Sequence, residues 1–183
     1  KLKNRDQDQL KTKYGFSKSD QIITYIGGYD HGYEEAFELF SSNVEALQQK
    51  YPVKVIVQTH PKCKNLAKTN LVEYKILQNY NVQNVTYSQG EISTDDAIGM
   101  ATLVTSQAST VIPQALFANI PAVFMNPMEV KNTLIEAGLA TNIQSSDEFI
   151  ETMEHLEQFE SNVYEQAQIP SNSVSLMLKT IGK

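Results

Sequence analysis

Residues Leu103 to Pro127 read LVTSQASTVIPQALFANIPAVFMNP, and this stretch decides the fold that we expect for the whole chain. An apolar run, Leu103 to Thr105, leads into small hydroxyl residues. A short segment of helical character follows, and a second apolar run, Ala122 to Met125, closes the unit. This order predicts a strand, a loop, a helix and a strand, which is the repeating unit of a parallel α/β sheet.

The loop of this unit carries three hydroxyl residues, Ser106, Ser109 and Thr110. In a parallel sheet such a loop lies at the carboxyl end of its strand, where ligands bind. The first amides of a helix have no partner within the helix, so hydroxyls beside them make an anion site. Capping a helix requires only one hydroxyl, so three hydroxyls exceed what a cap alone would explain. Proline fits best in the first helical turn, so Pro113 indicates that the helix begins a little after Ser109.

The residues before this unit alternate between strand and helix patterns. Residues 1–20 are polar and predict a short lead-in helix or an interdomain linker. The predicted strands are Gln21 to Ile26, Val53 to Val57 and Val82 to Tyr87. Helices are predicted from Glu34 to the break at Pro52, between Leu71 and Leu77, and from the cap at Ser93 through Met100.

The pattern continues after Pro127. We expect a helix from Met128 to Ala137, a sixth strand from Ala140 to Ile143, a helix through Phe159 whose capping box begins at Ser145, and a last helix from Val174 to Ile181. The whole chain therefore predicts a three-layer, doubly wound, Rossmann-like α/β fold, with about six mainly parallel strands and helices on both faces. Residues 21–160 form the expected domain and 161–183 a C-terminal helix region.

Composition narrows the classes of function. The 183 residues carry a formal net charge of -6, which argues against a general nucleic-acid or anionic-membrane surface. Cys63 is the single cysteine, so the chain has no intrachain disulfide and no cysteine cluster for zinc. The three histidines lie far apart, and we expect no metal site. The absence of a membrane span or signal peptide predicts a soluble protein in a reducing compartment, and the start without Met indicates a domain of a longer chain.

Other strand ends carry candidate ligand contacts. Gly27 and Gly28 follow the first strand, together with Tyr29 and His31 in the same loop. The glycines either make a tight turn only or also approach a ligand. Tyr29 and Tyr33 either stack on a base or cover the loop. Neither a G-x-G-x-x-G nor a G-x-x-x-x-G-K-[ST] motif is present, which disfavours dinucleotide binding and NTP hydrolysis.

His60 and Pro61 follow the second strand, and Gln89 and Gly90 turn the chain after the third. His60 either caps the sheet edge through a backbone hydrogen bond or donates to a phosphate oxygen. The aspartates after Ser93 suit the positive end of a helix dipole, and we interpret them as capping residues.

Taken together, these motifs resemble the C-terminal, donor-binding half of GT-B-fold glycosyltransferases, in the group that includes lipid-A-disaccharide synthase, MurG, UDP-N-acetylglucosamine 2-epimerase and CDP-glycerol transferases. The resemblance covers roughly residues 10 to 160. Gly27 and Gly28 match the first glycine loop of that fold. The pair His60 and Pro61 resembles the His-Pro pair of the CDP-glycerol transferase and bacterial sialyltransferase groups. The segment Ser106 to Leu116, with Asn119-Ile-Pro121 after it, resembles the donor motif that binds diphosphate and ribose.

The resemblance implies a domain that binds a nucleotide-diphospho-sugar, UDP being one candidate nucleotide, without a metal or cofactor. The implied donor-binding residues are Gly27, Gly28, Tyr29, His31, His60, Pro61, Gln89, Gly90, Ser106, Ser109, Thr110 and Gln114. Gln114 stands where many of these enzymes have the glutamate that holds the ribose. The acceptor and the general base would come from an N-terminal domain that this chain lacks, so the catalytic residues stay unassigned and the isolated domain is expected to be inactive in transfer.

The resemblance also implies a role in cell-envelope polysaccharide biosynthesis, in the cytoplasm or at the membrane periphery through the missing half. Two alternatives stay open at this point. One is a noncatalytic Rossmann-like binding or interaction module, which the departures at Gln114 and Pro113 favour. The other is a UDP-sugar 2-epimerase-like domain, which uses the same fold but needs carboxylates from both halves.

Overall fold

A computed structural model describes residues 6–128 and 133–156 of the chain. Its six strands form one sheet in the order β3-β2-β1-β4-β5-β6, and every neighbouring pair runs parallel. The strands are β1 (Gln21–Ile26), β2 (Val53–Gln58), β3 (Val85–Ser88), β4 (Leu103–Ser106), β5 (Ala122–Met125) and β6 (Asn142–Ile143). The predicted doubly wound, Rossmann-like fold is confirmed.

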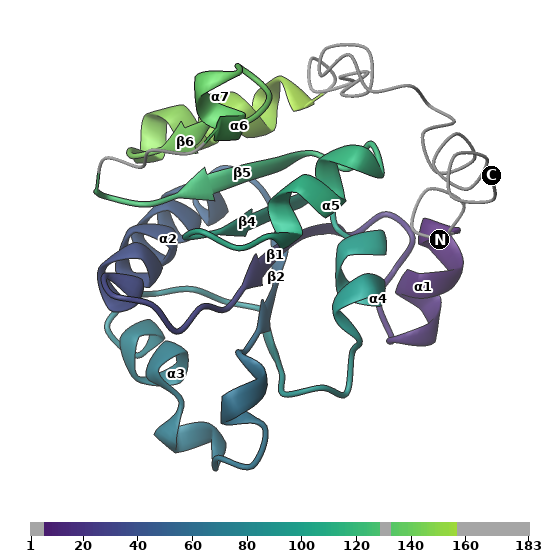
Figure 1. Ribbon diagram of the computed structural model, residues 1–183. Coiled ribbons are helices and arrows are strands. Elements are labelled where there is room, and N and C mark those ends of the chain that lie inside the picture. Colours follow the sequence, from purple (N-terminus) through teal and green to yellow (C-terminus); the bar gives the residue numbers. More distant parts are fainter. Residues whose placement is uncertain (1–5, 129–132, 157–183) are drawn as a thin grey trace, which may run out of the picture.

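Helices cover both faces of this sheet (Figure 1). On one face lie α2 (Tyr33–Gln48), α3 (Val72–Leu77) and α7 (Ser146–Glu154), which share a hydrophobic core with the sheet. The other face carries α1 (Gln7–Lys13), α4 (Thr94–Gly99), α5 (Val111–Phe117) and residues of α6 (Thr133–Glu136). Two short 3-10 turns, η2 (Pro61–Cys63) and η3 (Lys68–Asn70), precede α3.

The central strands are buried on both faces, which explains their nearly continuous apolar sequence. Tyr25 of β1 is fully buried, and its ring lies 4.9 Å from that of Phe37 and 4.6 Å from that of Phe40, measured between centroids. These aromatic contacts pack α2 against the centre of the sheet. The bounds of β1 and β5 agree with the strands predicted from the sequence.

Two strands begin later than their sequence pattern indicated. β3 starts at Val85 rather than Val82, because the backbone N–H of Gln83 donates to Gln48 of α2 and Asn84 takes a left-handed conformation with φ of 55°. β6 starts at Asn142 rather than Ala140, because the N–H of Ala140 donates back to the carbonyl of Leu134. In both cases a hydrogen bond to a helix or the end of a helix replaces pairing with the sheet.

The later helices overlap the predicted ones in part. α7 has the predicted cap, since Ser145 Oγ accepts from the N–H of Glu148, but this helix ends at Glu154 rather than Phe159. α6 begins at Thr133 within the described residues, and residues 129–132 of the predicted helix lie outside them. The predicted last helix, Val174 to Ile181, also lies outside the described residues.

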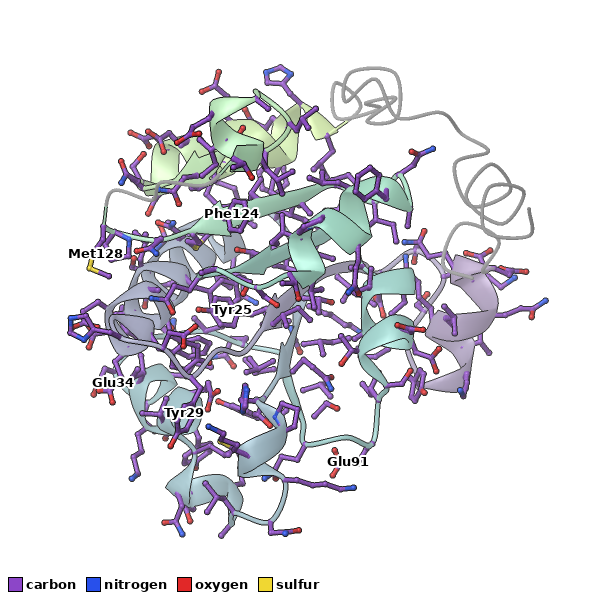
Figure 2. All side chains as sticks on the ribbon, viewed as in Figure 1. Tyr25, Tyr29, Glu34, Glu91, Phe124 and Met128 are labelled. Atoms are coloured by element: carbon purple, nitrogen blue, oxygen red, sulfur yellow. The ribbon has the colours of Figure 1, made fainter. Side chains whose placement is uncertain are left out.

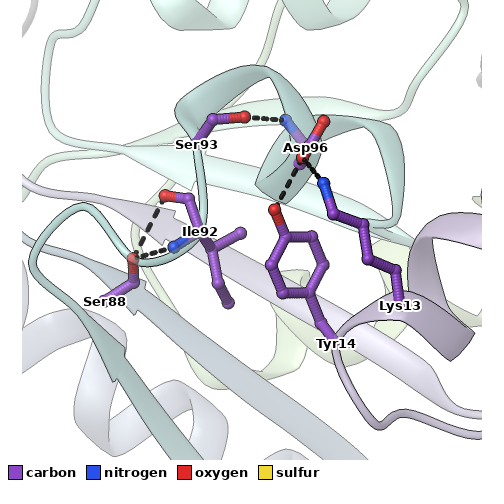
Figure 3. A network of polar contacts seen from close by, with 6 residues as sticks. All are labelled: Lys13, Tyr14, Ser88, Ile92, Ser93 and Asp96. Atoms are coloured by element: carbon purple, nitrogen blue, oxygen red, sulfur yellow. Dashed lines mark hydrogen bonds and ion pairs between the residues drawn. The ribbon is translucent and has the colours of Figure 1, made fainter.

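The lead-in helix α1 is attached to α4 by a polar network (Figure 3). Asp96 is 8% exposed, and its Oδ2 accepts from Lys13 Nζ at 2.9 Å and from the Tyr14 hydroxyl at 2.7 Å. Ser93 caps α4 by accepting from the N–H of Asp96 at 3.1 Å. This confirms Ser93 as a cap and gives Asp96 a second role, because the same residue holds α1 against the domain.

Among the helices of the described ranges, none combines the length and apolar character that crossing a bilayer requires.

Candidate functional site

The candidate site lies where the strand order reverses. β1 and β4 are neighbours in the sheet, but α2 follows β1 on one face and α5 follows β4 on the other. The two connecting loops therefore leave the carboxyl edge of the sheet toward opposite faces. This is the topological switch point at which open α/β sheets bind ligands.

Gly27 brings the loop after β1 into contact with the loop after β2. Its N–H donates to the carbonyl of Gln58 at 2.7 Å. A Cβ atom at this position would lie 2.8 Å from that oxygen and 3.0 Å from the backbone nitrogen of His60. The need for glycine here thus arises from backbone packing within the protein, which is the tight-turn alternative of the sequence analysis.

His60, Tyr29 and Lys62 form a small cluster beside this contact. The rings of Tyr29 and His60 lie 5.4 Å apart, and Lys62 Nζ lies 3.9 Å from the centroid of the Tyr29 ring. His60 Nδ1 accepts from the backbone N–H of Lys62, so Nε2 is the ring nitrogen left to donate. Pro61 begins η2 directly after His60. His60 therefore caps η2, and Tyr29, 63% exposed, presents an aromatic surface beside it.

The hydroxyl residues after β4 occupy different environments. Ser106 is buried and donates to the carbonyl of Ile26 at 2.9 Å, so its proton joins β4 to β1. Ser109 accepts from the N–H of Val111 at 3.2 Å. Thr110 and Gln114 are exposed, and Thr110 makes no side-chain cap. Ser109, Thr110 and Gln114 are therefore the members of this group whose side chains are at least partly open to solvent.

Pro113 is the third residue of α5, which begins at Val111. The first helical amides have no partner within the helix, so proline costs no intrahelical hydrogen bond at this position. The structure confirms that the helix starts a little after Ser109.

Gln107 is a site residue that the sequence analysis missed. It is 3% exposed, and its amide nitrogen donates to the carbonyl of His31 at 2.9 Å, which ties the β4–α5 loop to the β1–α2 loop across the switch point. The sequence feature that could have pointed to Gln107 is its place as a polar residue directly after the buried strand β4. Gly32 next to His31 has a φ of 78°, and Met128 packs against it.

Gln89 and Gly90 lie directly after β3, at the carboxyl edge of the sheet. The side-chain amide of Gln89 donates to the carbonyls of Cys63 at 2.6 Å and Leu66 at 2.9 Å, and Gly90 adopts a φ of 121°. These bonds hold the segment between η2 and η3. These hydrogen bonds thus join the turn after β3 to this segment and not to the glycine loop.

A pocket of about 460 Å³ opens between the β1–α2 loop and the segment from η2 to α3. Three predicted site residues line it: Gly28, Tyr29 and His31. Figure 2 shows Tyr29 and Glu34 near this side of the molecule, with Met128 further along the same edge. The pocket also contains two buried residues, Tyr33, for which the sequence left base stacking or loop cover open, and Glu73, which the sequence did not point to.

Tyr33 and Glu73 form a buried hydrogen bond. The Tyr33 hydroxyl donates to Glu73 Oε1 at 2.6 Å, and Glu73 is 2% exposed. Burial raises the pKa of Tyr33 far above its ordinary value, with further contributions from Tyr25 and Glu73. Burial also raises the pKa of the nearby Cys63 thiol, and the Glu73 charge adds to this effect. Cys63 therefore stays a protonated thiol at neutral pH, which disfavours a nucleophilic role.

Within the described ranges, no three His, Cys, Asp or Glu side chains come together in a way that would hold a metal ion.

Sequence comparisons identify no relative: no family model matches the chain, and no curated protein does. Solved structures do match. UDP-GlcNAc 2-epimerase from Neisseria meningitidis, bound to UDP-GlcNAc, has a TM-score of 0.64 at 16% identity, over 96% of this chain and 48% of its own.

Two further structures show the same relationship. The wall teichoic acid polymerase TagF, soaked with CDPG, has a TM-score of 0.57 at 10% identity, over 96% of this chain and 44% of its own. E. coli ADP-heptose LPS heptosyltransferase II has a TM-score of 0.57 at 15% identity, over 84% of this chain and 50% of its own. The chain thus spans about half the length of the structures that it matches. Its fold is that of one half of GT-B glycosyltransferase-like proteins.

Proposed function

We propose that this chain is the donor-binding half of a GT-B-type glycosyltransferase, which holds a nucleotide-diphospho-sugar at the switch point. The observation that carries the proposal is the convergence of the β1, β2 and β4 loops. The Gly27 amide contacts the end of β2, and Gln107 joins the β4 loop to His31. Three loops that were separate in the sequence therefore form one continuous edge.

This edge offers groups suited to a diphosphate. His60 Nε2 and Lys62 Nζ lie beside the glycine loop, and Ser109 and Thr110 stand in the loop after β4, the strand next to β1. Hydrogen-bond donors and a cation placed in advance stabilise the charge that develops on a leaving diphosphate. We propose that they do so without a metal ion or cofactor. Tyr29 would contact the base or the sugar, and Gln114 would bond the ribose through its amide.

The structural matches support the same ligand class. The names of the three matched proteins refer to UDP-GlcNAc, CDPG and ADP-heptose, which are nucleotide-linked compounds. We infer that the acceptor and the general base come from a second domain, because the matched structures are about twice as long. The reaction class would be glycosyl transfer, with UDP a candidate nucleotide and cell-envelope polysaccharide synthesis a candidate pathway.

The test is a titration of the chain with UDP-, CDP- and ADP-sugars, monitored by amide chemical shifts, with EDTA present in a parallel series. We expect saturable shifts in the β1–α2 and β4–α5 loops that EDTA does not change. The double variant Ser109→Ala/Thr110→Ala should bind at least tenfold more weakly. Ser19→Ala/Thr141→Ala, which removes two exposed hydroxyls elsewhere, is the matched control.

No binding of any nucleotide sugar at millimolar concentration would reject the proposal and favour a noncatalytic interaction module. Equal affinity of the two double variants would show instead that the β4–α5 hydroxyls do not hold the diphosphate.

A further inference from the structure

The side chain of Gln107 packs against the glycine loop, residues 27–32. Gln107 follows β4 directly and is 3% exposed. Its Nε2 donates to the carbonyl of His31 at 2.9 Å. A Cβ atom at Gly32 would lie 3.3 Å from this Nε2, and one at Gly28 would lie 3.6 Å from Oε1. The side-chain amide of Gln107 therefore lies beside the loop near both of its ends, where two glycines leave room for it.

The exposed tip of this loop, residues 29–31, has few other attachments. In the part of the chain that the structure describes, the bond from Gln107 is the one side-chain hydrogen bond that reaches the tip. The tip is otherwise attached by the ring contacts of Tyr29 and by the carbonyl of Asp30. A loop with few contacts opens easily, so a bond from a buried side chain has a large share in holding the tip in one conformation.

Gln107 also belongs to the loop that carries the proposed diphosphate contacts. Ser109 and Thr110 stand two and three positions after it, and Ser109 accepts from the N–H of Val111 at the start of α5. Because a buried side chain has a fixed place, Gln107 sets the distance between these hydroxyls and the tip of the glycine loop. It acts through the backbone of His31 and does not itself meet a ligand, since it is almost completely buried.

We propose that Gln107 is a positioning residue of the donor site, which holds Tyr29 and His31 where they meet a nucleotide sugar bound by the β4–α5 loop. This role rests on the proposed function. A contact that is ordered in advance raises affinity, because binding then costs less conformational entropy. Without the bond to His31 the hydroxyls of the β4–α5 loop remain in place, but the tip has to be ordered when the ligand binds.

Three variants test the bond to His31 before any ligand is added. Gln107→Met has a side chain of similar length and removes the donor. Gln107→Glu cannot donate when it is ionised, but its protonated carboxyl donates again. Gln58→Met is the matched control, because Gln58 is also a buried glutamine at the end of a strand, and its amide donates to the carbonyl of Ile92 at 3.1 Å.

We expect Gln107→Met to shift and broaden the amide signals of residues 29–32, and Gln58→Met to leave them unchanged. Gln107→Glu should resemble Gln107→Met at about pH 8 and return toward the unmodified chain near about pH 4.5, because burial raises the pKa of a carboxyl above roughly 4.3. Gln107→Met retains Asp30 and His31, so its spectra at each pH show what these groups contribute. Unchanged signals in Gln107→Met, equal changes in both methionine variants, or no return of Gln107→Glu would overturn the proposal.

The same variants are then titrated with the tightest-binding of the UDP-, CDP- and ADP-sugars. Gln107→Met should bind about tenfold more weakly, as expected when one hydrogen bond has to be replaced by ordering of the loop. Its ligand-induced amide shifts should persist in residues 107–111 and shrink in residues 29–32, which a general loss of stability would not produce. Gln107→Glu should regain affinity relative to Gln107→Met as the pH falls.

The outcomes separate this role from the proposed function. If no nucleotide sugar binds the unmodified chain, the proposed function fails and the positioning role fails with it. If one binds the unmodified chain and a folded Gln107→Met variant equally, only the positioning role fails. If Gln107→Met does not fold, Gln107→Glu decides in its place, and an affinity that does not rise toward that of the unmodified chain as the pH falls would overturn the proposal.

Discussion

Removing the Tyr33 hydroxyl tests whether Glu73 is as poorly paired as the structure shows. Tyr33→Phe takes away the 2.6 Å bond to Oε1 and leaves both oxygens of a 2%-exposed carboxylate without a protein partner. A hydrogen bond to a charged group contributes about 1.5–3 kcal/mol, so the free energy of unfolding should fall by about 2–3 kcal/mol. Glu73→Met leaves the proton of the buried Tyr33 hydroxyl without its acceptor, although the hydroxyl oxygen still accepts from the Gly28 backbone N–H, and should cost about 1–3 kcal/mol.

The double variant Tyr33→Phe/Glu73→Met removes both polar partners together. Apolar groups of similar shape then fill the space, so its loss should be near 1 kcal/mol or less, far below the sum of the single losses. Urea unfolding followed by circular dichroism gives the three values, provided that the slope with denaturant stays constant.

The pair Tyr51 and Glu154 provides a matched control, because its hydrogen bond has the same length of 2.6 Å but is exposed. Tyr51→Phe should therefore destabilise the protein much less than Tyr33→Phe. Additive single losses at Tyr33 and Glu73, or equal effects of the two tyrosine substitutions, would refute the idea that burial makes the Glu73 contact costly to break.

Two other predictions concern the loops and the sheet. Gly27→Ala places a Cβ atom 2.8 Å from a backbone oxygen and should lower the free energy of unfolding by about 1–3 kcal/mol. Gly28→Ala, whose Cβ would lie 3.0 Å from a ring carbon of Tyr33 and meet no backbone atom as closely, should cost less in the same urea assay. Equal losses would contradict the backbone contact. The hydrogen bond from Lys54, at 2.7 Å, is the main reason that the pKa of Asp20 lies below its ordinary value of 3.8. The ionised carboxylate therefore stabilises the fold above about pH 4, and this contribution is lost as the pH falls through the lower folded-state pKa. Asp20→Asn should destabilise the protein at neutral pH, and its difference from the unmodified chain should shrink as the pH falls below the ordinary pKa of 3.8. A difference that stays constant with pH would refute this.

The sheet was predictable from local sequence because its central strands are buried on both faces. Such strands appear as short apolar runs bounded by glycine or polar residues, as Gln21 to Ile26 and Ala122 to Met125 do. The residues at which strands begin were less predictable where hydrogen bonds to distant parts of the chain determine them. The Gln48 side chain lies 35 positions from Gln83 and determines where β3 starts, and no pattern around Val82 records this contact.

The candidate site shows the same division. Residues at the ends of strands, such as Gly27 and His60, could be selected from the sequence because the fold places all parallel strand ends on one edge, and their contact with a ligand stays a prediction. Ser106 was selected for the same reason, and whether it meets a ligand stays a prediction, since its proton is donated to Ile26.

Glu73 could not be found in this way, because a glutamate in the first turn of a short helix is the ordinary partner of a helix dipole. Its importance comes from Tyr33, 40 positions earlier, which is itself buried by the aromatic packing of α2 on β1. The same packing that holds α2 on the sheet therefore excludes water from the carboxylate. The single hydrogen bond from Tyr33 therefore offsets only part of the cost of burying this carboxylate, because Oε2 has no hydrogen-bond partner in the described part of the chain.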